Sequence, residues 1–216
     1  MIKQLKFINF FRINDRGGFL LLWSIQTRNV YDILMKDGVY HTDPQKSLAD
    51  DSDFPNEMSL FHVAYDWISE QMRVRIGVPP SPDITYPVWA FYQWEGKRKR
   101  LDMRTHRVWG LKGTPIVLLT LDIPKNMVLL SDFDAWHCVL NDWFLPMNEK
   151  EELLLQEQAD SYSNVDEREN VKKKSWENVF LWDKETEYWS SPKTTQATFW
   201  ELKKEWVKKA EFYLSK

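Results

Sequence analysis

The chain has 216 residues and a formal net charge of -3, so it is long enough to bury a substantial core as one domain. The acidic balance excludes a protein whose whole surface binds nucleic acid, although it leaves room for a local basic patch. Cys138 is the single cysteine, which excludes an internal disulfide framework and a multi-cysteine zinc site. Since no apolar run approaches the roughly 18 residues of a membrane span, we expect a cytoplasmic protein that does not contact a membrane.

The first part of the chain predicts a strand, a helix and a strand in succession. Residues 1–18 are either an extension or the first strand of a hairpin. The strand Phe19–Gln26 follows. Thr27 then caps a short helix that ends at Gly38, where a left-handed residue belongs, and Val39–His41 resumes as strand.

A long helix and a central strand are expected next. The polar segment Asp43–Asn56 predicts a loop, with Asn56 as the helix cap. Apolar residues then recur at helical spacing until Gly77 stops the helix, namely Phe61, Tyr65, Ile68 and Met72. Tyr86–Trp94 is apolar on both alternating faces, which is typical of a buried central strand.

The segment from Thr114 to Pro146 predicts two strands followed by a helix without a gap. Ile116–Ile123 is a near-continuous apolar run, so we expect a strand covered on both faces, and Met127–Leu130 is expected to form the next one. Ser131 or Asp132 then caps a helix. Its expected apolar stripe is Phe133, Trp136, Leu140 and Trp143 or Phe144, and its polar face is Asp134, His137 and Asn141.

The last third predicts two further helices around a polar stretch. Asn148–Ala159 is expected to form an acidic helix, and Asp160–Ser175 a loop or linker, so the region near 147–175 is expected to be a mobile polar segment of the single domain 19–216. The aromatic residues of Trp176–Trp189 are expected to dock on the main body. The chain is expected to close on a helix with the apolar stripe Phe199, Leu202, Trp206, Ala210 and Tyr213 or Leu214. The expected fold is therefore α+β, with a mixed or split antiparallel sheet, helices packed on it and a closing C-terminal helix.

Three single side chains invite a chemical interpretation. His137, with Asp134 three residues before it and Asn141 four after it, could orient a substrate, transfer a proton or ligate a metal, but the same stripe also fits a solvated face. Cys138 lacks a nucleophile motif and is interpreted as a packing residue. Glu201 is interpreted as part of a capping box with Thr198. No metal site is predicted.

A cluster of basic residues follows the aromatic central strand. The cluster consists of Lys97, Arg98, Lys99, Arg100 and Arg104, within a basic loop at 97–107. It leaves directly from Tyr92 and Trp94, and cations beside aromatic faces are the ingredients of nucleic-acid or phosphate binding. The alternative is a solvated hairpin loop.

Four separated motifs carry a family resemblance. LLWSIQT, YPVWAFYQW, VLLSDFDAWHCVLN and QATFWELKKEWV together resemble a bacterial family catalogued only as a domain of unknown function. The resemblance runs from about Leu20 to the C-terminus. It implies a bacterial or phage origin and carries no activity with it.

Parts of the chain also resemble two better understood families. LLWSIQTRNVYDILMKDG is similar to the opening of ASCH domains, which are PUA-like modules tied to RNA, and this resemblance implies a noncatalytic module that recognises RNA or a modified base. The order of elements up to VLLTLDIPKNMVLLSD is similar to that of ADP-ribosyltransferases, which place Arg or His on the first strand and usually a Glu on a late one. A structural interaction protein whose aromatic residues are all core is the third alternative.

The transferase resemblance implies a site for NAD or a related nucleotide. In that reading Ser24 and Gln26 stand on the first strand at the nicotinamide side, and His41 and a late acid share the same cleft. The stacking residues would be Trp23, Tyr92 and Trp94, and Lys97 to Arg100 would meet phosphates. His137 is the remaining catalytic candidate.

Overall fold

The computed structural model describes residues 18–43, 55–103, 112–188 and 192–215, with side chains left out for 55–60. The strands are β1 (Phe19–Thr27), β2 (Val39–Tyr40), β3 (Val88–Gln93), β4 (Pro115–Pro124), β5 (Leu129–Asp132), β6 (Thr195–Phe199), β7 (Leu202–Lys203) and β8 (Val207–Leu214). The helices are α1 (Arg28–Asp37), α3 (Pro55–Ile76), α4 (Phe133–Leu140), α5 (Glu149–Ser161) and α6 (Val165–Ser175), with 3-10 turns η1 (Lys125–Met127), η2 (Trp176–Phe180) and η3 (Lys204–Trp206).

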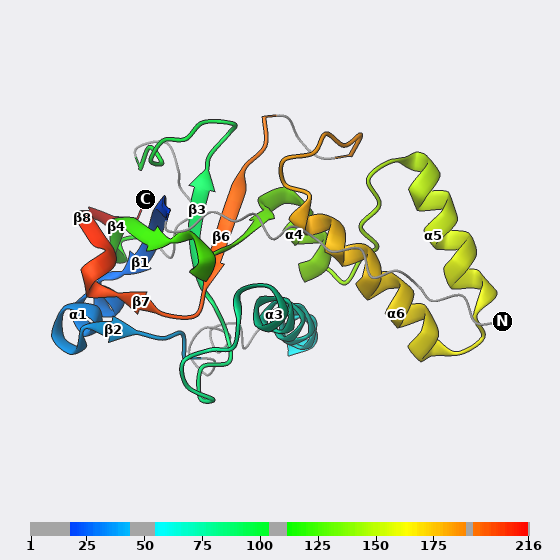
Figure 1. Cartoon of the computed structure of the whole chain (residues 1–216), viewed down its shortest axis with the longest axis horizontal. Coiled ribbons are helices and arrows are strands. Elements are labelled where there is room, and N and C mark those ends of the chain that lie inside the picture. The colour runs from blue at the N-terminus through cyan, green and yellow to red at the C-terminus, as the bar shows by residue number, and fades with distance from the viewer. Residues whose placement is uncertain (1–17, 44–54, 104–111, 189–191, 216) are drawn as a thin grey trace.

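Within these residues, six strands form one antiparallel sheet in the order β5-β6-β3-β1-β4-β8, and β2 pairs with β7 in a separate ribbon (Figure 1). β1 pairs with β4 along its whole length, whereas it meets β3 at a single register position, Trp23↔Phe91. The sheet is therefore split into the halves β1-β4-β8 and β3-β6-β5. This confirms the prediction of an α+β fold with a split antiparallel sheet.

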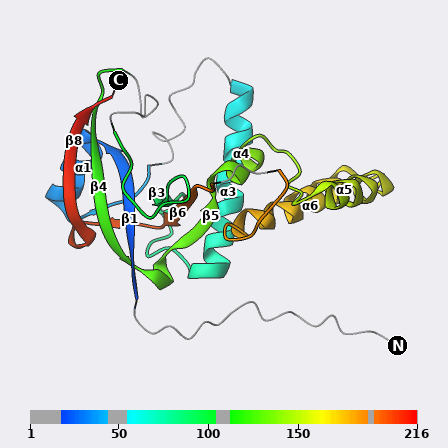
Figure 2. The ribbon, with the colours of Figure 1, turned by 90° about the horizontal axis from the view of Figure 1, so that it is seen from above.

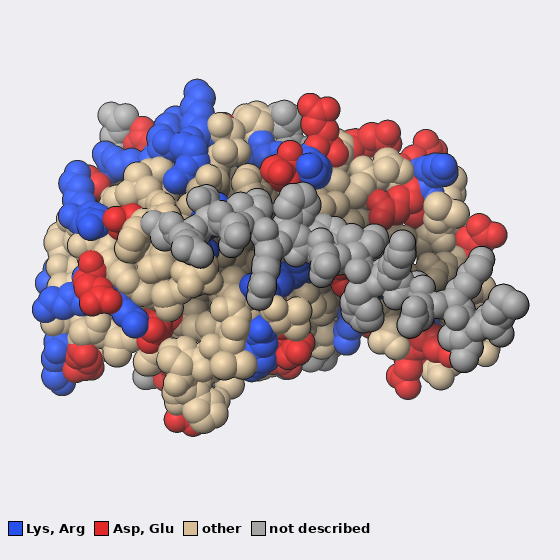
Figure 3. Space-filling view, in the orientation of Figure 1, with Lys and Arg blue, Asp and Glu red and all other residues tan. Residues whose placement is uncertain are grey.

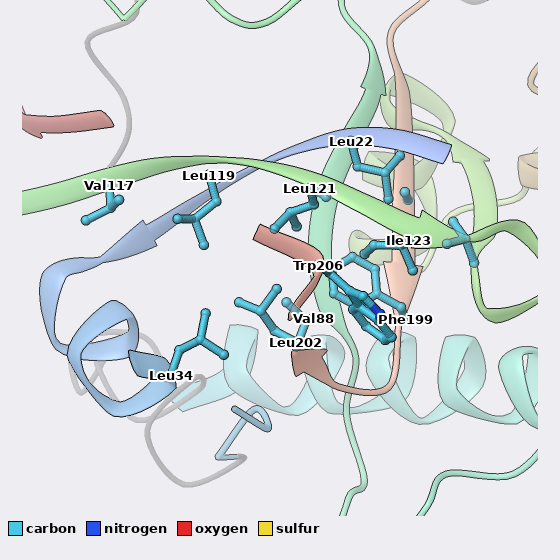
Figure 4. Packing of buried hydrophobic residues seen from close by; sticks show 13 residues of the cluster. Leu22, Leu34, Val88, Val117, Leu119, Leu121, Ile123, Phe199, Leu202 and Trp206 are labelled. Carbon is cyan, nitrogen blue, oxygen red and sulfur yellow. The ribbon is translucent and has the colours of Figure 1, made fainter. Parts of the chain in front are cut away.

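The main core lies between β1 and β4 on one side and the β2-β7 ribbon on the other. Figure 4 shows Leu119 of β4 pointing toward Leu34 of α1, and Leu22 and Leu121 pointing toward Phe199 and Trp206. Most of β4 is fully buried, as its near-continuous apolar run predicts. Burial on both faces explains why so many aliphatic residues follow one another in this strand.

Helix ends follow the local capping signals. Thr27 Oγ1 accepts a hydrogen bond from the backbone nitrogen of Val30 (3.3 Å), and Gly38 ends α1 with a φ of 82°. The Asp132 carboxylate accepts from Asp134 and Ala135 at the start of α4. The predicted caps of both helices are confirmed, with Asp132 rather than Ser131 capping α4.

The predicted C-terminal helix is wrong, because the last residues form β6, β7, η3 and β8. Thr198 cannot cap a helix, since it lies inside β6, opposite Trp89 on one side and Leu129 on the other. Its hydroxyl donates to the Leu129 carbonyl (3.3 Å). β8 closes the chain instead as an edge strand beside β4 (Figure 2).

Two further predictions need correction. The stretch 160–175 is not a loop throughout, because α6 fills its second part after the cap Asn164 and buries Val171 and Lys172. The stripe of α4 ends earlier than predicted, since the helix stops at Leu140. Figures 1 and 2 show α5 and α6 extending side by side from the end opposite β8, so the expected mobile segment contains a helical hairpin.

Candidate functional site

The split in the sheet leaves part of one edge of β3 without a strand partner. Ser24 Oγ donates to the Trp89 carbonyl (2.7 Å), and Thr42 Oγ1 donates to the Pro87 carbonyl (2.9 Å). These carbonyls are two residues apart, roughly 7 Å along an extended chain. Two hydroxyl groups therefore take the place of backbone N-H donors here, and we call this region the β3-edge site.

Ser24 and Gln26 form one polar pair of the β3-edge site. Ser24 is completely buried, and its hydroxyl accepts a hydrogen bond from Gln26 Nε2 (2.7 Å) while it donates to β3. Ser24 is therefore a positioning residue that cannot itself reach a ligand. It holds the half-buried Gln26 amide by its nitrogen and leaves the amide oxygen to accept a further hydrogen bond.

His41 and Glu201 form the second pair, immediately beside Thr42. His41 Nε2 lies 3.5 Å from Glu201 Oε2, and Lys203 Nζ lies 2.9 Å from the other carboxylate oxygen. The histidine side chain is 37% exposed and the glutamate 10%. A carboxylate that fixes one ring nitrogen leaves the other free for proton transfer, and such contacts are often long before a substrate binds.

A buried tyrosine lies one residue before the carbonyl that binds Thr42. The Tyr86 hydroxyl donates to Asp66 on α3 (3.1 Å), and His62 Nδ1 lies 3.0 Å from the same oxygen. Burial, and after it the Asp66 carboxylate, raises the pKa of Tyr86 to about 12. Tyr86 therefore stays protonated and ties the start of β3 to α3.

The predicted stacking residues lie on both sides of the split. Trp23 is buried (5% exposed), and Tyr92 and Trp94 are half-buried. The Arg98 guanidinium lies 3.6 Å from the Tyr92 ring centroid and 5.3 Å from that of Trp23, and it donates to the Leu21 carbonyl (2.8 Å). Arg98 thus covers the exposed side of both rings and fastens the basic loop to β1.

The basic loop opens with a tight turn. Glu95 and Gly96 both have positive φ angles, 46° and 72°, and a Cβ atom at Gly96 would stand 2.7 Å from Pro192. Arg100 donates to the Tyr213 hydroxyl (3.1 Å) and pairs with Glu211 (3.3 Å).

Two lysines of the loop that are predicted to contact nucleic acid have exposed side chains. Lys97 and Lys99 are exposed, and neither ammonium pairs with an acid among the described residues. Arg104 lies outside the described residues. Among the described residues of the loop, these two lysines carry positive charge without an acidic partner, and the exposed side chains of Arg98 and Arg100 add to it.

The remaining candidates lie apart from the β3-edge site. His137 is exposed on α4, and its Nδ1 donates to the Phe133 carbonyl (2.9 Å). Cys138 is buried, and burial raises the pKa of its thiol to about 11, so it behaves as a packing residue. In the described part of the chain, no cluster of His, Cys or acidic side chains could hold a metal ion. Nor does any described helix have the length and apolar character needed to cross a membrane.

Some polar residues near the sheet carry no functional prediction from the sequence. Thr42 falls between the predicted strand Val39–His41 and the predicted loop Asp43–Asn56 and carries no prediction, and for Glu201 the sequence favours a helix cap. Ser131 Oγ, Thr195 Oγ1 and Gln196 Nε2 are buried without a hydrogen-bond partner among the described residues. The run Thr194–Gln196 is polar and buried. If this segment had been predicted as a strand, its polar residues would have indicated a polar position inside the sheet.

The fold and the β3-edge site define an α+β domain with a split antiparallel sheet and a histidine-carboxylate pair at the split. The chain belongs to a family described as a domain of unknown function, DUF3841, whose model matches residues 21–208. This confirms the family that the four motifs indicated. No curated protein and no solved structure is similar enough to match the chain.

Proposed function

We propose that the chain is an ADP-ribosyltransferase-like domain that binds NAD or a related nucleotide at the β3-edge site. The observation that carries this proposal is the contact of His41 with Glu201 next to the hydroxyl-lined edge that also holds Gln26. The transferase resemblance implies a late acid facing the first strand. Glu201 supplies an acid from the short link between β6 and β7, and Gln26 supplies a polar group from β1.

Each side chain has a defined part in this proposal. The oxygen of the Gln26 amide would accept a hydrogen bond from the carboxamide of nicotinamide, and Ser24 would hold that amide in place. The Nε2-H of His41 would face Glu201, which leaves Nδ1 as the general base. Lys203 would hold the Glu201 carboxylate in place through its other oxygen.

The transfer itself balances without any further reagent. The bond between C1′ of the ribose and the nicotinamide nitrogen breaks, and neutral nicotinamide leaves with the bonding electrons. A hydroxyl or amino group of the acceptor forms the new bond to C1′. Its proton passes to Nδ1 of His41, and the Glu201 carboxylate stabilises the imidazolium that results.

The test is to incubate the protein with NAD and with total bacterial RNA, DNA or lysate. Mass spectrometry then measures released nicotinamide and any ADP-ribose mass added to a macromolecule. Removing a general base typically lowers a rate by about 10²- to 10⁴-fold, so we expect a loss of that order in His41→Ala. His137→Ala is the matched control, since this exposed histidine on α4 makes no contact with the site, and it should retain full activity.

Gln26→Ala separates ligand binding from proton transfer. It should raise the NAD concentration needed for half-maximal release more than it lowers the maximal rate, since the amide is assigned to binding. Intact NAD with every acceptor, or equal activity of His41→Ala and wild type, would overturn the proposal. Circular dichroism and thermal unfolding of each variant check that folding is retained.

A noncatalytic PUA-like module that binds nucleic acid is the second candidate. Lys97 and Lys99 favour it, since both are exposed and neither pairs with an acid in the described part of the chain. If NAD stays intact while the protein retains an oligonucleotide, and if Lys97→Ala with Lys99→Ala weakens that binding and flattens its salt dependence, this candidate replaces the transferase.

A further inference from the structure

A hollow of about 310 Å³ lies at the end of β8, beside the start of α1 and of β4. Its lining consists of Arg28, Pro115, Ile116, Phe212, Tyr213 and Leu214. Phe212 is 50% exposed and Leu214 66%. An open edge strand usually carries charged side chains that discourage contact, as Lys208 and Lys209 do earlier in β8. The apolar end of the strand departs from that rule.

Arg28 gives this hollow a flat, positively charged wall. Its guanidinium carbon lies 4.7 Å from the Phe212 ring centroid and 5.7 Å from that of Tyr31. Arg28 Nε pairs with Asp32 one helical turn later (2.9 Å), yet the arginine side chain remains about half exposed. A guanidinium fixed in this way offers a plane for stacking and free N-H groups for an anion.

Further cations surround the last residues of β8. Arg100 reaches the strand from the basic loop through the Tyr213 hydroxyl and is 48% exposed. Lys112 is exposed next to Gly113, whose nitrogen donates to the Ser215 carbonyl (2.9 Å). Figure 3 shows Lys and Arg side chains gathered over the end of the molecule that holds β8 and α1, while Asp and Glu predominate at the α5 end.

The nearby acids cancel this charge only in part, although Asp102 also acts on Arg100. Glu211 is 17% exposed, and Arg100 (3.3 Å) and Lys209 (3.1 Å) both pair with it. Asp32 is committed to Arg28. The end of β8 therefore combines an exposed aromatic ring, a stacked guanidinium and a positive rim, which are the elements that bind an unpaired base and its phosphates.

We infer that the end of β8 binds single-stranded nucleic acid, with a base against Arg28 and Phe212 and the backbone passing along Arg100 and Lys112. A free phosphate would need no aromatic ring, and a duplex offers no exposed base face to stack. The inference goes beyond the proposed transferase activity, because these residues lie outside the β3-edge site and binding is measured without NAD.

The test is fluorescence anisotropy of labelled RNA and DNA single strands of about 12 nucleotides, with the matching duplex as a comparison. Stacking of one base is worth about 1–3 kcal/mol, so Phe212→Leu should weaken binding roughly 5- to 150-fold. Arg28→Gln should weaken it too, because it removes the guanidinium from beside the base. Lys112→Gln should lower the slope of log K against log salt by about 0.7, the value for one phosphate contact on a single strand. The matched control is Leu154→Ala, an equally exposed apolar residue on α5, which should bind like wild type.

Three results would overturn the inference: no single-strand binding by the wild type, unchanged affinity in both Phe212→Leu and Arg28→Gln, or equal affinity for the duplex. Photocrosslinking of a 4-thiouridine oligonucleotide to the wild-type protein gives a readout that does not depend on the folding of a variant. Crosslinks should map to the peptides that contain Phe212 or Tyr31. Crosslinks confined to the Lys97–Arg100 peptide would contradict the assignment to β8.

Discussion

Replacing Trp136 by alanine tests the packing of α4 against the sheet. Trp136 is 4% exposed, and its ring centroid lies 5.0 Å from that of Trp89 on β3 and 6.1 Å from that of Tyr65 on α3. The indole therefore fills the space where α3, α4 and the β3-β6-β5 half of the sheet meet. Removing the indole would leave a cavity, because α3, α4 and the sheet cannot all move inward to fill it.

The expected cost is large compared with the stability of a domain. Truncating a large aromatic residue in a core to alanine typically lowers the free energy of unfolding by about 3–5 kcal/mol. The whole free energy of unfolding of a folded protein is roughly 5–15 kcal/mol. For a chain of this size each kcal/mol lowers the melting temperature by about 2–4 °C, so Trp136→Ala should melt roughly 6–20 °C below wild type. Urea unfolding followed by circular dichroism should show a lower midpoint with an unchanged m-value.

The next residue along the helix supplies the control. His137 is exposed, and among the described residues its ring contacts the edge of Phe133 (4.8 Å between centroids) besides making its backbone hydrogen bond. His137→Ala should change the free energy of unfolding by no more than about 0.5 kcal/mol. If His137→Ala were the more damaging change, or if both were neutral, the inward face of α4 would be assigned wrongly.

Three other predictions concern ionisable groups. Lys172 is 8% exposed and pairs with Asp142 (2.6 Å) and Glu169 (2.8 Å), which are themselves partly exposed. In thermal unfolding, Lys172→Met should therefore lower the free energy of unfolding by about 1–3 kcal/mol more than Lys174→Met, which changes an exposed lysine. The pKa of Tyr86 rises from 10.0 to about 12 on folding, so its contribution to stability is present below pH 10 and is lost as pH rises through about 12; Tyr86→Phe should flatten the fall of the urea midpoint in that range. The raised pKa of the buried Cys138 thiol predicts that a disulfide reagent labels it at neutral pH only after denaturant is added.

The parts of the fold that sequence analysis predicted rest on short-range signals. Thr27 and Gly38 delimit α1, and Asp132 begins α4, because capping depends on hydrogen bonds within one or two turns. The buried run of β4 is also local, since its composition reflects cover on both faces. Each of these signals lies within about ten residues of the element that it predicts.

The C-terminal region shows why the rest was missed. Phe199, Leu202 and Trp206 recur at helical spacing, yet they come from β6, β7 and η3 and bury their side chains in one core. A chain that forms several short strands and a 3-10 turn over one core can place buried apolar residues at the same intervals as a helix does. Only the long-range pairing of β6 with β3 and of β8 with β4 distinguishes the two.

The same long-range pairing creates the candidate site. β2 and β7 pair with Val39 opposite Lys203 and Tyr40 opposite Leu202, and one more step in this register sets His41 beside Glu201. Two residues 160 positions apart thus become partners through a ribbon that no local signal reveals. The sequence by itself favours a capping box for Glu201 over the role of the late acid, because the helical spacing of the C-terminal apolar residues predicts a helix at this point.

If His41 and Glu201 act as one unit, their effects on catalysis cannot be independent. In nicotinamide release, His41→Ala should remove most of the activity, and Glu201→Gln should lower it less because the imidazole remains. Since the carboxylate acts through the imidazole, adding Glu201→Gln to His41→Ala should cost little more. Independent effects would instead multiply in the double variant, which would mean that the two side chains do not work together and that the register of β2 and β7 has structural importance alone.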